Sequence, residues 1–168
     1  MNTTLTLAGA GLDLGILYLN IRPWWKGGRN PKDLAHFGGS FALGSVSTMC
    51  AGGVLGWLAG CSAAGLNRAG NTTLHGATGA TPGGAIAHGS LGTLTQEGAV
   101  VVLIATVVAG AAWKVAGKAD RRRMAGGALC GSSLTLTAGV AGALSWLPAA
   151  VNGLGAALRT GLEGGGLL

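Results

Sequence analysis

Residues 34–67 contain no formally charged side chain, and this long uncharged run limits how the chain can fold. About 20 predominantly apolar residues span the hydrocarbon core of a bilayer, so the run is long enough to cross one. A straight helix over the whole run would reach roughly 50 Å at 1.5 Å per residue. We therefore expect it to break, tilt or project from the bilayer, with Gly38-Gly39 and Gly52-Gly53 as the weak points.

The composition favours a membrane protein over a soluble domain. Charged residues make up 10% of the chain, against about 25% in soluble domains. Glycine supplies 34 of the 168 residues, and aromatic residues only 5%. Small residues allow helix backbones to approach closely, which is how helices associate in lipid.

Two further apolar runs follow, at 98–116 and 124–147. The second run of the chain, "GAVVVLIATVVAGAAW", is also compatible with a buried strand in water, whereas in lipid it is a spanning helix. The third run carries no charge, and Pro148 ends or kinks it. The sequence thus predicts an all-α integral membrane bundle with three transmembrane helices, at 34–66, 98–116 and 124–147.

The N-terminal segment, residues 1–21, is apolar and long enough to span but contains Asp13. A charged residue at the centre of a transmembrane helix costs about 2.5–3.5 kcal/mol on insertion scales. Two interpretations remain open. The segment spans the bilayer in an oligomer that shelters Asp13, or it lies along the membrane interface.

Charge placement predicts the orientation of the bundle. Segments 22–33 and 117–123 are strongly basic, whereas the Gly/Thr-rich segment 67–97 is a polar loop and 148–168 a short amphipathic segment. Basic loops stay on the cytoplasmic side of a membrane, which predicts a multi-pass cell-membrane protein with both basic segments inside and the 67–97 loop outside. Four tryptophans stand near the ends of the apolar segments as interfacial anchors: Trp24, Trp25, Trp113 and Trp146.

Small residues recur at every fourth position in two of the runs, and such positions share one face of a helix. The first stripe is Ser40, Gly44, Thr48, Gly52, Gly56, Gly60 and Ala64; the second is Gly127, Gly131, Thr135, Gly139 and Ala143. Glycine weakens a helix by about 1 kcal/mol relative to alanine in water, yet in lipid it opens a packing surface. We interpret the stripes as helix-packing interfaces, and their length favours a partner in a neighbouring copy. The alternative is a biased composition that scatters small residues everywhere.

The sequence lacks a set of residues suited to catalysis. His36, His75 and His88 have no carboxylate at useful spacing, and phosphate-loop, GxSxG and HExxH motifs are missing. We expect a protein that is not an enzyme and that needs no cofactor or metal, with a metal pair at His75 and His88 as the weaker alternative.

The basic loop is the sharpest charged feature: Lys114, Lys118, Arg121, Arg122 and Arg123. It is either a topogenic cytoplasmic loop or a surface for anions, namely phospholipid headgroups or nucleic acid. In a symmetric oligomer the arginines would form a basic ring, which suits a lumen that carries polyanions.

One stretch resembles a known family: "VVVLIATVVAGAAWKVAGKADRRRMAGGALCGSSLTLTAGVAGALSW", within residues 98–146. Two apolar helices joined by a short basic loop are typical of the small hydrophobic pilins of type IV secretion and conjugation systems. The resemblance implies helices packed into a helical tube, with Lys118, Arg121, Arg122 and Arg123 facing its lumen.

Three functional hypotheses follow. The leading one is a non-enzymatic membrane protein that homo-oligomerises through its small-residue faces. It would form a ring, pore or pilus-like tube of a transfer or secretion apparatus, with that machine's other membrane subunits as partners. The second is a holin-like, lesion-forming protein. The third is a structural membrane or virion-associated subunit without a pore, so the assembled form is either membrane-bound or part of a filament or virion.

Overall fold

A computed structural model describes residues 4–28, 31–50, 52–81 and 83–164, and the prediction of an all-α protein is confirmed over this part of the chain. Seven helices form there: α1 (Leu7–Lys26), α2 (Pro31–Ser47), α3 (Val54–Thr78), α4 (Gln96–Val115), α5 (Lys118–Leu134), α6 (Ala138–Ala143) and α7 (Leu147–Gly164). Strand-like pairing within the described residues is limited to two isolated bridges, Thr6 with Ala85 and His88 with Thr137.

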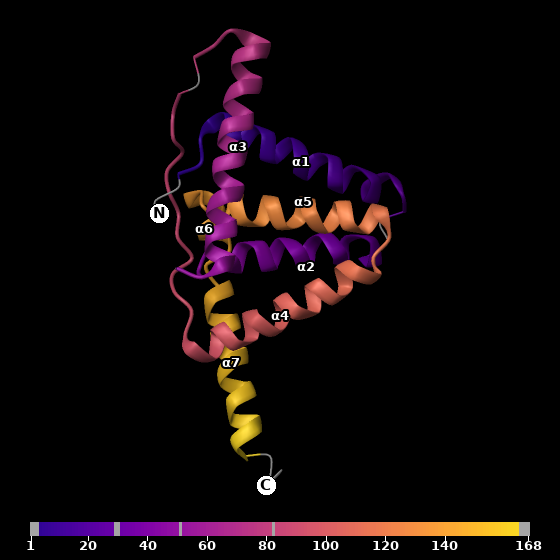
Figure 1. The fold of residues 1–168 in the computed structure, drawn as a ribbon, viewed down its shortest axis with the longest axis vertical. Helices are drawn as coiled ribbons and strands as arrows, with labels where there is room; N and C mark the ends of the chain where they lie inside the picture. The colour runs from indigo at the N-terminus through magenta and orange to yellow at the C-terminus, as the bar shows by residue number, and fades with distance from the viewer. Residues whose placement is uncertain (1–3, 29–30, 51, 82, 165–168) are drawn as a thin grey trace.

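Four helices form a layer in the order α1, α5, α2, α4 (Figure 1). Helices α1 and α4 run in one direction and α2 and α5 in the other, so α1 and α4 begin at one end of the layer and α2 and α5 at the opposite end. Helices α3 and α7 cross the layer at the end where α1 and α4 begin, and we call this the crossed end. The opposite end, where α2 and α5 begin, is the basic end. An extended segment, residues 83–95, follows the crossed end, and we call it the strap.

Helix α3 is joined to the start of α1 by a compact polar contact. The Thr6 hydroxyl caps α1 by accepting from Gly9 N at 3.1 Å, and Thr6 N donates to Asn67 Oδ1 on α3 at 2.8 Å. An added Cβ at Gly70 would lie 2.5 Å from the Ala8 carbonyl oxygen. A capping threonine, an asparagine and a close backbone approach therefore attach the crossing helix to the layer.

The start of α4 carries the same contact with α7. The Thr95 hydroxyl accepts from Gly98 N at 3.1 Å, and Thr95 N donates to Asn152 Oδ1 at 3.0 Å. Gly155 meets the Glu97 backbone, as Gly70 meets that of α1. Two units of the same design, α1–α3 and α4–α7, therefore build this protein, and α6 is an extra turn within the second. Figure 1 shows α3 and α7 pointing in opposite directions from the layer, as an approximate twofold axis between α2 and α5 requires.

The two units meet where α2 packs against α5, and glycine makes that contact close. An added Cβ at Gly131 would overlap the Phe41 carbonyl, and one at Gly127 would overlap that of Phe37. Gly44 faces the α5 backbone in the same way. Without Cβ atoms the two backbones lie in direct contact, which also favours weak Cα–H···O interactions.

The predicted single span at 34–66 is wrong, because the chain turns between α2 and α3. The turn falls at the predicted weak point: Gly52 has φ +79°, a backbone conformation that favours glycine. Hydroxyls also end the helix, since Ser47 Oγ donates to the Gly44 carbonyl and Thr48 Oγ1 to that of Ser45. The other predicted weak point, Gly38-Gly39, lies inside α2 without a break.

The predicted polar loop at 67–97 is shorter than expected, because α3 continues to Thr78. Its threonine hydroxyls donate to carbonyls one turn earlier, as Thr72 does to Arg68, so polar side chains are compatible with the helix. The helix ends at Gly79, whose φ is +70°. The segment that is not helical runs from there to the start of α4.

Two further predicted boundaries need correction. Lys118 to Arg123, placed in a loop at 117–123, form the first turns of α5. The predicted span 124–147 is interrupted after α5, passes through α6, and continues as α7 in another direction. Helix α4, in contrast, has nearly the bounds predicted at 98–116. The N-terminal segment 1–21 is helical from Leu7, and its helix extends into the basic segment 22–33.

Filling the α2–α5 contact should destabilise the protein. We expect Gly44→Leu to lower the free energy of unfolding by about 1–3 kcal/mol or more, because the α5 backbone leaves no room for the side chain. Gly39→Leu is the control on the same helix, since no atom lies within 4 Å of a Cβ there. Helicity followed by circular dichroism during titration of micelles with SDS measures both. Equal loss of stability in the two variants would contradict the close contact.

Candidate functional site

Helix α4 presents a large apolar surface that no other described element covers. Leu103, Val107 and Val115 are 63%, 65% and 88% exposed, whereas Val102 and Gly98 face inward. Among the described residues, α4 is the one helix long and apolar enough to cross a membrane by length and composition. A contiguous exposed patch of this kind marks a surface meant for lipid or for another protein.

Helix α1 carries a similar apolar surface on the opposite flank of the layer. Leu14, Tyr18, Leu19 and Trp25 are all exposed. The central helices differ, because their buried positions include Ser40, Ser45, Ser132 and Ser133 together with glycines. Large apolar side chains are thus exposed on both flanks, while glycines and small polar residues share the interior with buried apolar residues such as Phe37, Met124 and Leu134.

The basic side chains gather at one end of the layer. Lys26 closes α1, Lys114 closes α4, and Lys118 to Arg123 open α5, so all lie at the basic end. Arg29 lies outside the described residues. Cations at a helix N-terminus oppose the helix dipole at roughly 0.3–1 kcal/mol each. The stability of α5 as an isolated helix therefore does not explain the arginines at its start.

The structure separates the five predicted residues of the basic loop by what they contact. Arg121 caps α4: its Nε donates to the Trp113 carbonyl at 3.0 Å and its Nη2 to that of Lys114 at 2.9 Å. Arg123 pairs with Asp120 at 3.4 Å. Lys114, Lys118 and Arg122 have exposed side chains. Arg121 thus ties the end of α4 to the start of α5, a role that the residue pattern did not indicate.

The first small-residue stripe does not form one face, because the turn after α2 divides it. Ser40 and Gly44 are buried in α2, Thr48 and Gly52 lie in the turn, Gly56 and Gly60 are half-buried on α3, and Ala64 is exposed. The second stripe is divided in the same way. Gly127 and Gly131 are buried against α2, Thr135 is buried after α5, and Gly139 and Ala143 are exposed on α6. The buried parts of the two stripes face each other within one chain.

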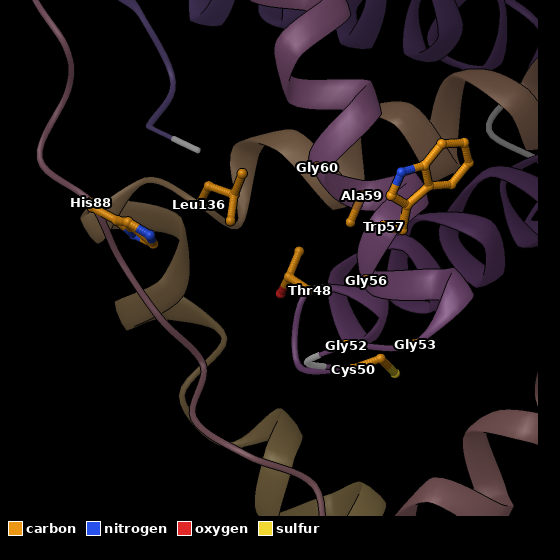
Figure 2. A pocket seen from close by; sticks show the side chains of 10 residues that line it. All are labelled: Thr48, Cys50, Gly52, Gly53, Gly56, Trp57, Ala59, Gly60, His88 and Leu136. Atoms are coloured by element: carbon orange, nitrogen blue, oxygen red, sulfur yellow. The ribbon is translucent and has the colours of Figure 1, made fainter. Parts of the chain in front are cut away.

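Four residues of the first stripe line an open cavity of about 380 Å³. Figure 2 shows it between the α2–α3 turn, the start of α3, the strap and Leu136, with His88 across from Trp57. Thr48 and Cys50 add a hydroxyl and a thiol, and burial raises the pKa of the Cys50 thiol. A thiol held in this protonated form is a poor nucleophile. Within the described residues, no three His, Cys, Asp or Glu side chains lie close enough together to hold a metal ion.

The tryptophans lie at the two ends of the layer. Trp24, Trp25 and Trp113 are at the basic end, where Trp25 and Trp113 are exposed. Trp146 is exposed at the crossed end, and so is Trp57, which the sequence pattern did not identify as an anchor.

Asp13 is fully buried, and α5 of the same chain covers it. The Ser133 hydroxyl donates to its Oδ2, whereas Oδ1 has no hydrogen-bond partner. The sequence marked this residue only as an obstacle to insertion, so the intramolecular shelter is a structural finding.

Comparison of this chain with known protein families, curated proteins and solved structures gives no match.

The segment that resembles pilins, residues 98–146, does not form a packed two-helix hairpin. Helix α2 lies between α4 and α5, and the two helices instead pack mainly on α7 and α2, respectively.

Loss of the arginine cap should loosen the corner between α4 and α5. We expect Arg121→Gln to lower the free energy of unfolding by about 1–3 kcal/mol, because charged donors to carbonyls contribute more than neutral ones. Arg122→Gln removes the same charge from an exposed neighbour and should change stability by less than about 0.5 kcal/mol. Thermal unfolding in detergent compares them, and identical shifts would contradict the capping role.

Proposed function

We propose that this protein is a non-enzymatic, four-pass membrane subunit that assembles with copies of itself into a ring or tube of a transfer or secretion apparatus. Helices α1, α2, α4 and α5 cross the bilayer, with the basic end in the cytoplasm. Helices α3 and α7 lie along the outer surface. One observation carries the proposal: the layer exposes large apolar side chains on both flanks and gathers its basic side chains at one end.

The lengths of the four helices suit a bilayer. Helices α1 and α4 have 20 residues and α2 and α5 have 17, which corresponds to about 25–30 Å at 1.5 Å per residue, and this length includes the basic start of α5 at the membrane surface. The hydrocarbon core is about 30 Å thick. Helices α2 and α5 are less apolar than α4, and their central position explains this, because their neighbours in the chain shield them from lipid.

Helix α7 has the pattern of a helix that lies in the membrane interface. On α7, Leu154, Leu158 and Leu162 are exposed, while Arg159 pairs with Glu163 at 2.7 Å and with Glu97 at 2.9 Å. One apolar and one charged side suit a helix parallel to the bilayer surface. The polar contacts of Thr6 and Thr95 fix both crossing helices at the start of a spanning helix.

Contacts between copies are available on the flanks and not in the centre. The central glycines are occupied by the α2–α5 contact, but Gly11 and Gly15 on α1 and Gly110 on α4 have no atom within 4 Å of a Cβ. Small residues on lipid-facing helices allow close association. A ring of copies would collect Lys118 and Arg122 at the cytoplasmic mouth, a surface suited to phospholipid headgroups or nucleic acid.

Membrane orientation can be tested by labelling. In a variant with the three native cysteines replaced, a cysteine at Ser90 should react with an impermeant maleimide added to intact cells. A cysteine at Ala119 should react only after the membrane is opened, because it lies at the basic end. Reaction of both positions from the same side would contradict the four-pass arrangement.

Self-assembly can be tested by native mass spectrometry and crosslinking in mild detergent. We expect a ladder of oligomers for the wild type and fewer crosslinks for Gly15→Leu with Gly110→Leu, which place bulk on both flanks. Gly76→Leu, on the far part of α3, should leave the ladder unchanged. A strict monomer would overturn the assembly. Rapid loss of membrane potential on expression would instead favour the holin-like function.

A further inference from the structure

Asp13 is the one described carboxyl group inside the helical layer. Its residue is 0% exposed, and it faces α5, where Ser133 contacts Oδ2 and the Cys130 thiol donates to its backbone oxygen at 3.6 Å. Oδ1 has no partner. A buried carboxyl group without an ion pair is costly, and in a membrane helix such a residue is a candidate functional site.

The second unit of the protein shows what the fold needs at this position. Thr6 and Thr95 cap α1 and α4 in the same way, so the two helices can be aligned residue by residue. Asp13 then corresponds to Val102, which is 4% exposed and belongs to an apolar cluster that joins the two units.

Ser133, the hydrogen-bond partner of Asp13, also corresponds to an apolar residue at the equivalent position. Gly44 on α2 and Gly131 on α5 each lie against the backbone of the other helix, so the two glycines are equivalent and give the residue correspondence between α2 and α5. Ser133 then corresponds to Val46, which is 5% exposed and belongs to the same apolar cluster as Val102. The contact between α2 and α4 thus places two valines where the contact between α1 and α5 places an aspartate and a serine. Packing alone does not require the polar pair.

The hydrogen bonds around Ser133 distinguish two protonation states. Its hydroxyl lies within hydrogen-bond distance of Asp13 Oδ2 and of the Leu129 carbonyl, at 2.6 Å from the latter, but it has one hydrogen to donate. If Asp13 is charged, the hydroxyl donates to Oδ2 and a negative charge remains without a cation. If Asp13 is neutral, its own O–H donates to Ser133 Oγ, and Ser133 donates to Leu129.

Among the described residues, no cation forms an ion pair with Asp13. From α5 the titratable neighbour is Cys130. On α3 the asparagines bind Thr6, as Asn67 does, and Arg68 is exposed. On α2, the described side chain of His36 is exposed. A metal cation such as Na⁺ needs several oxygen ligands, whereas the structure places one hydroxyl against this carboxyl group. A proton is the cation that fits.

We propose that Asp13 is a proton-binding site inside the membrane layer and that Ser133 is its positioning residue. Release of the proton breaks the O–H bond of Asp13 and leaves the electron pair on the carboxylate, while the proton passes to water or hydroxide. The Ser133 hydroxyl then turns from Leu129 to Asp13, and uptake reverses both changes. The inference rests on burial between α1 and α5, so it stands whether or not copies assemble.

Infrared spectroscopy of the full-length protein in phosphatidylcholine vesicles tests the site. At neutral pH we expect a carboxylic acid C=O band that shifts in D₂O and is lost in Asp13→Asn. Asp120→Asn is the matched control, because Asp120 pairs with Arg123 at the surface and should not contribute to this band. Absence of the band from the wild type, or its persistence in Asp13→Asn, would overturn the proposal.

Two further variants separate the proton site from a structural role. Ser133→Ala removes the acceptor of the Asp13 proton and should shift the C=O band without abolishing it. Asp13→Val with Ser133→Val copies the valine pair of the α2–α4 contact and should keep the helicity and the thermal stability of the wild type while losing the band. Unfolding of the double variant would show that the polar pair serves the fold, and an unshifted band in Ser133→Ala would remove Ser133 from the mechanism.

Discussion

The direct backbone contact between α2 and α5 is the constraint on which the rest of the structure depends. Gly44, Gly127 and Gly131 leave no space for side chains between the two helices, and hydroxyls complete the contact. Thr135 Oγ1 donates to Ser45 Oγ at 2.9 Å, and Ser45 Oγ donates to the Phe41 carbonyl at 2.9 Å. Because α2 belongs to one unit and α5 to the other, this contact joins the two halves of the protein.

Several features follow from that junction. Helices α2 and α5 both begin at the basic end, so each partner helix, α1 or α4, must end there, and the basic segments of both units meet on one side. The flanking helices keep their outer faces free and apolar. Large apolar side chains are exposed on the flanks, and glycine and serine make the closest contacts in the centre, beside buried apolar residues such as Phe37 and Leu134.

The sequence predicted this arrangement where local chemistry decides the structure. The apolar run of α4 and the break at Gly52-Gly53 were predicted correctly, since β-branched apolar residues and paired glycines act over a few neighbours. Polar residues 67–78 suggested a loop, yet they form part of α3, because contact of Gly70 with α1 stabilises the helix from outside its own sequence. The sequence did not reveal the repeat, because the two units share few residues. The equivalence of Asn67 and Asn152 is recognised only in the structure, where each accepts a hydrogen bond from the backbone of a capping threonine. The sequence also did not predict that the glycine faces of α2 and α5 pack on each other within one chain, because this depends on long-range contacts.

Duplication explains how this layer can contain a buried aspartate. If the protein had a single contact of this kind between a flanking and a central helix, a polar substitution there would weaken the one contact that holds the layer together. Here the two contacts are separate: α1 packs on α5, and α4 packs on α2. Val46 and Val102 keep one of them apolar, so the cost of the Asp13–Ser133 pair falls on the other contact alone. A difference between the two units at such a position is therefore better explained by a proton than by packing, since the valine pair already shows how packing is satisfied.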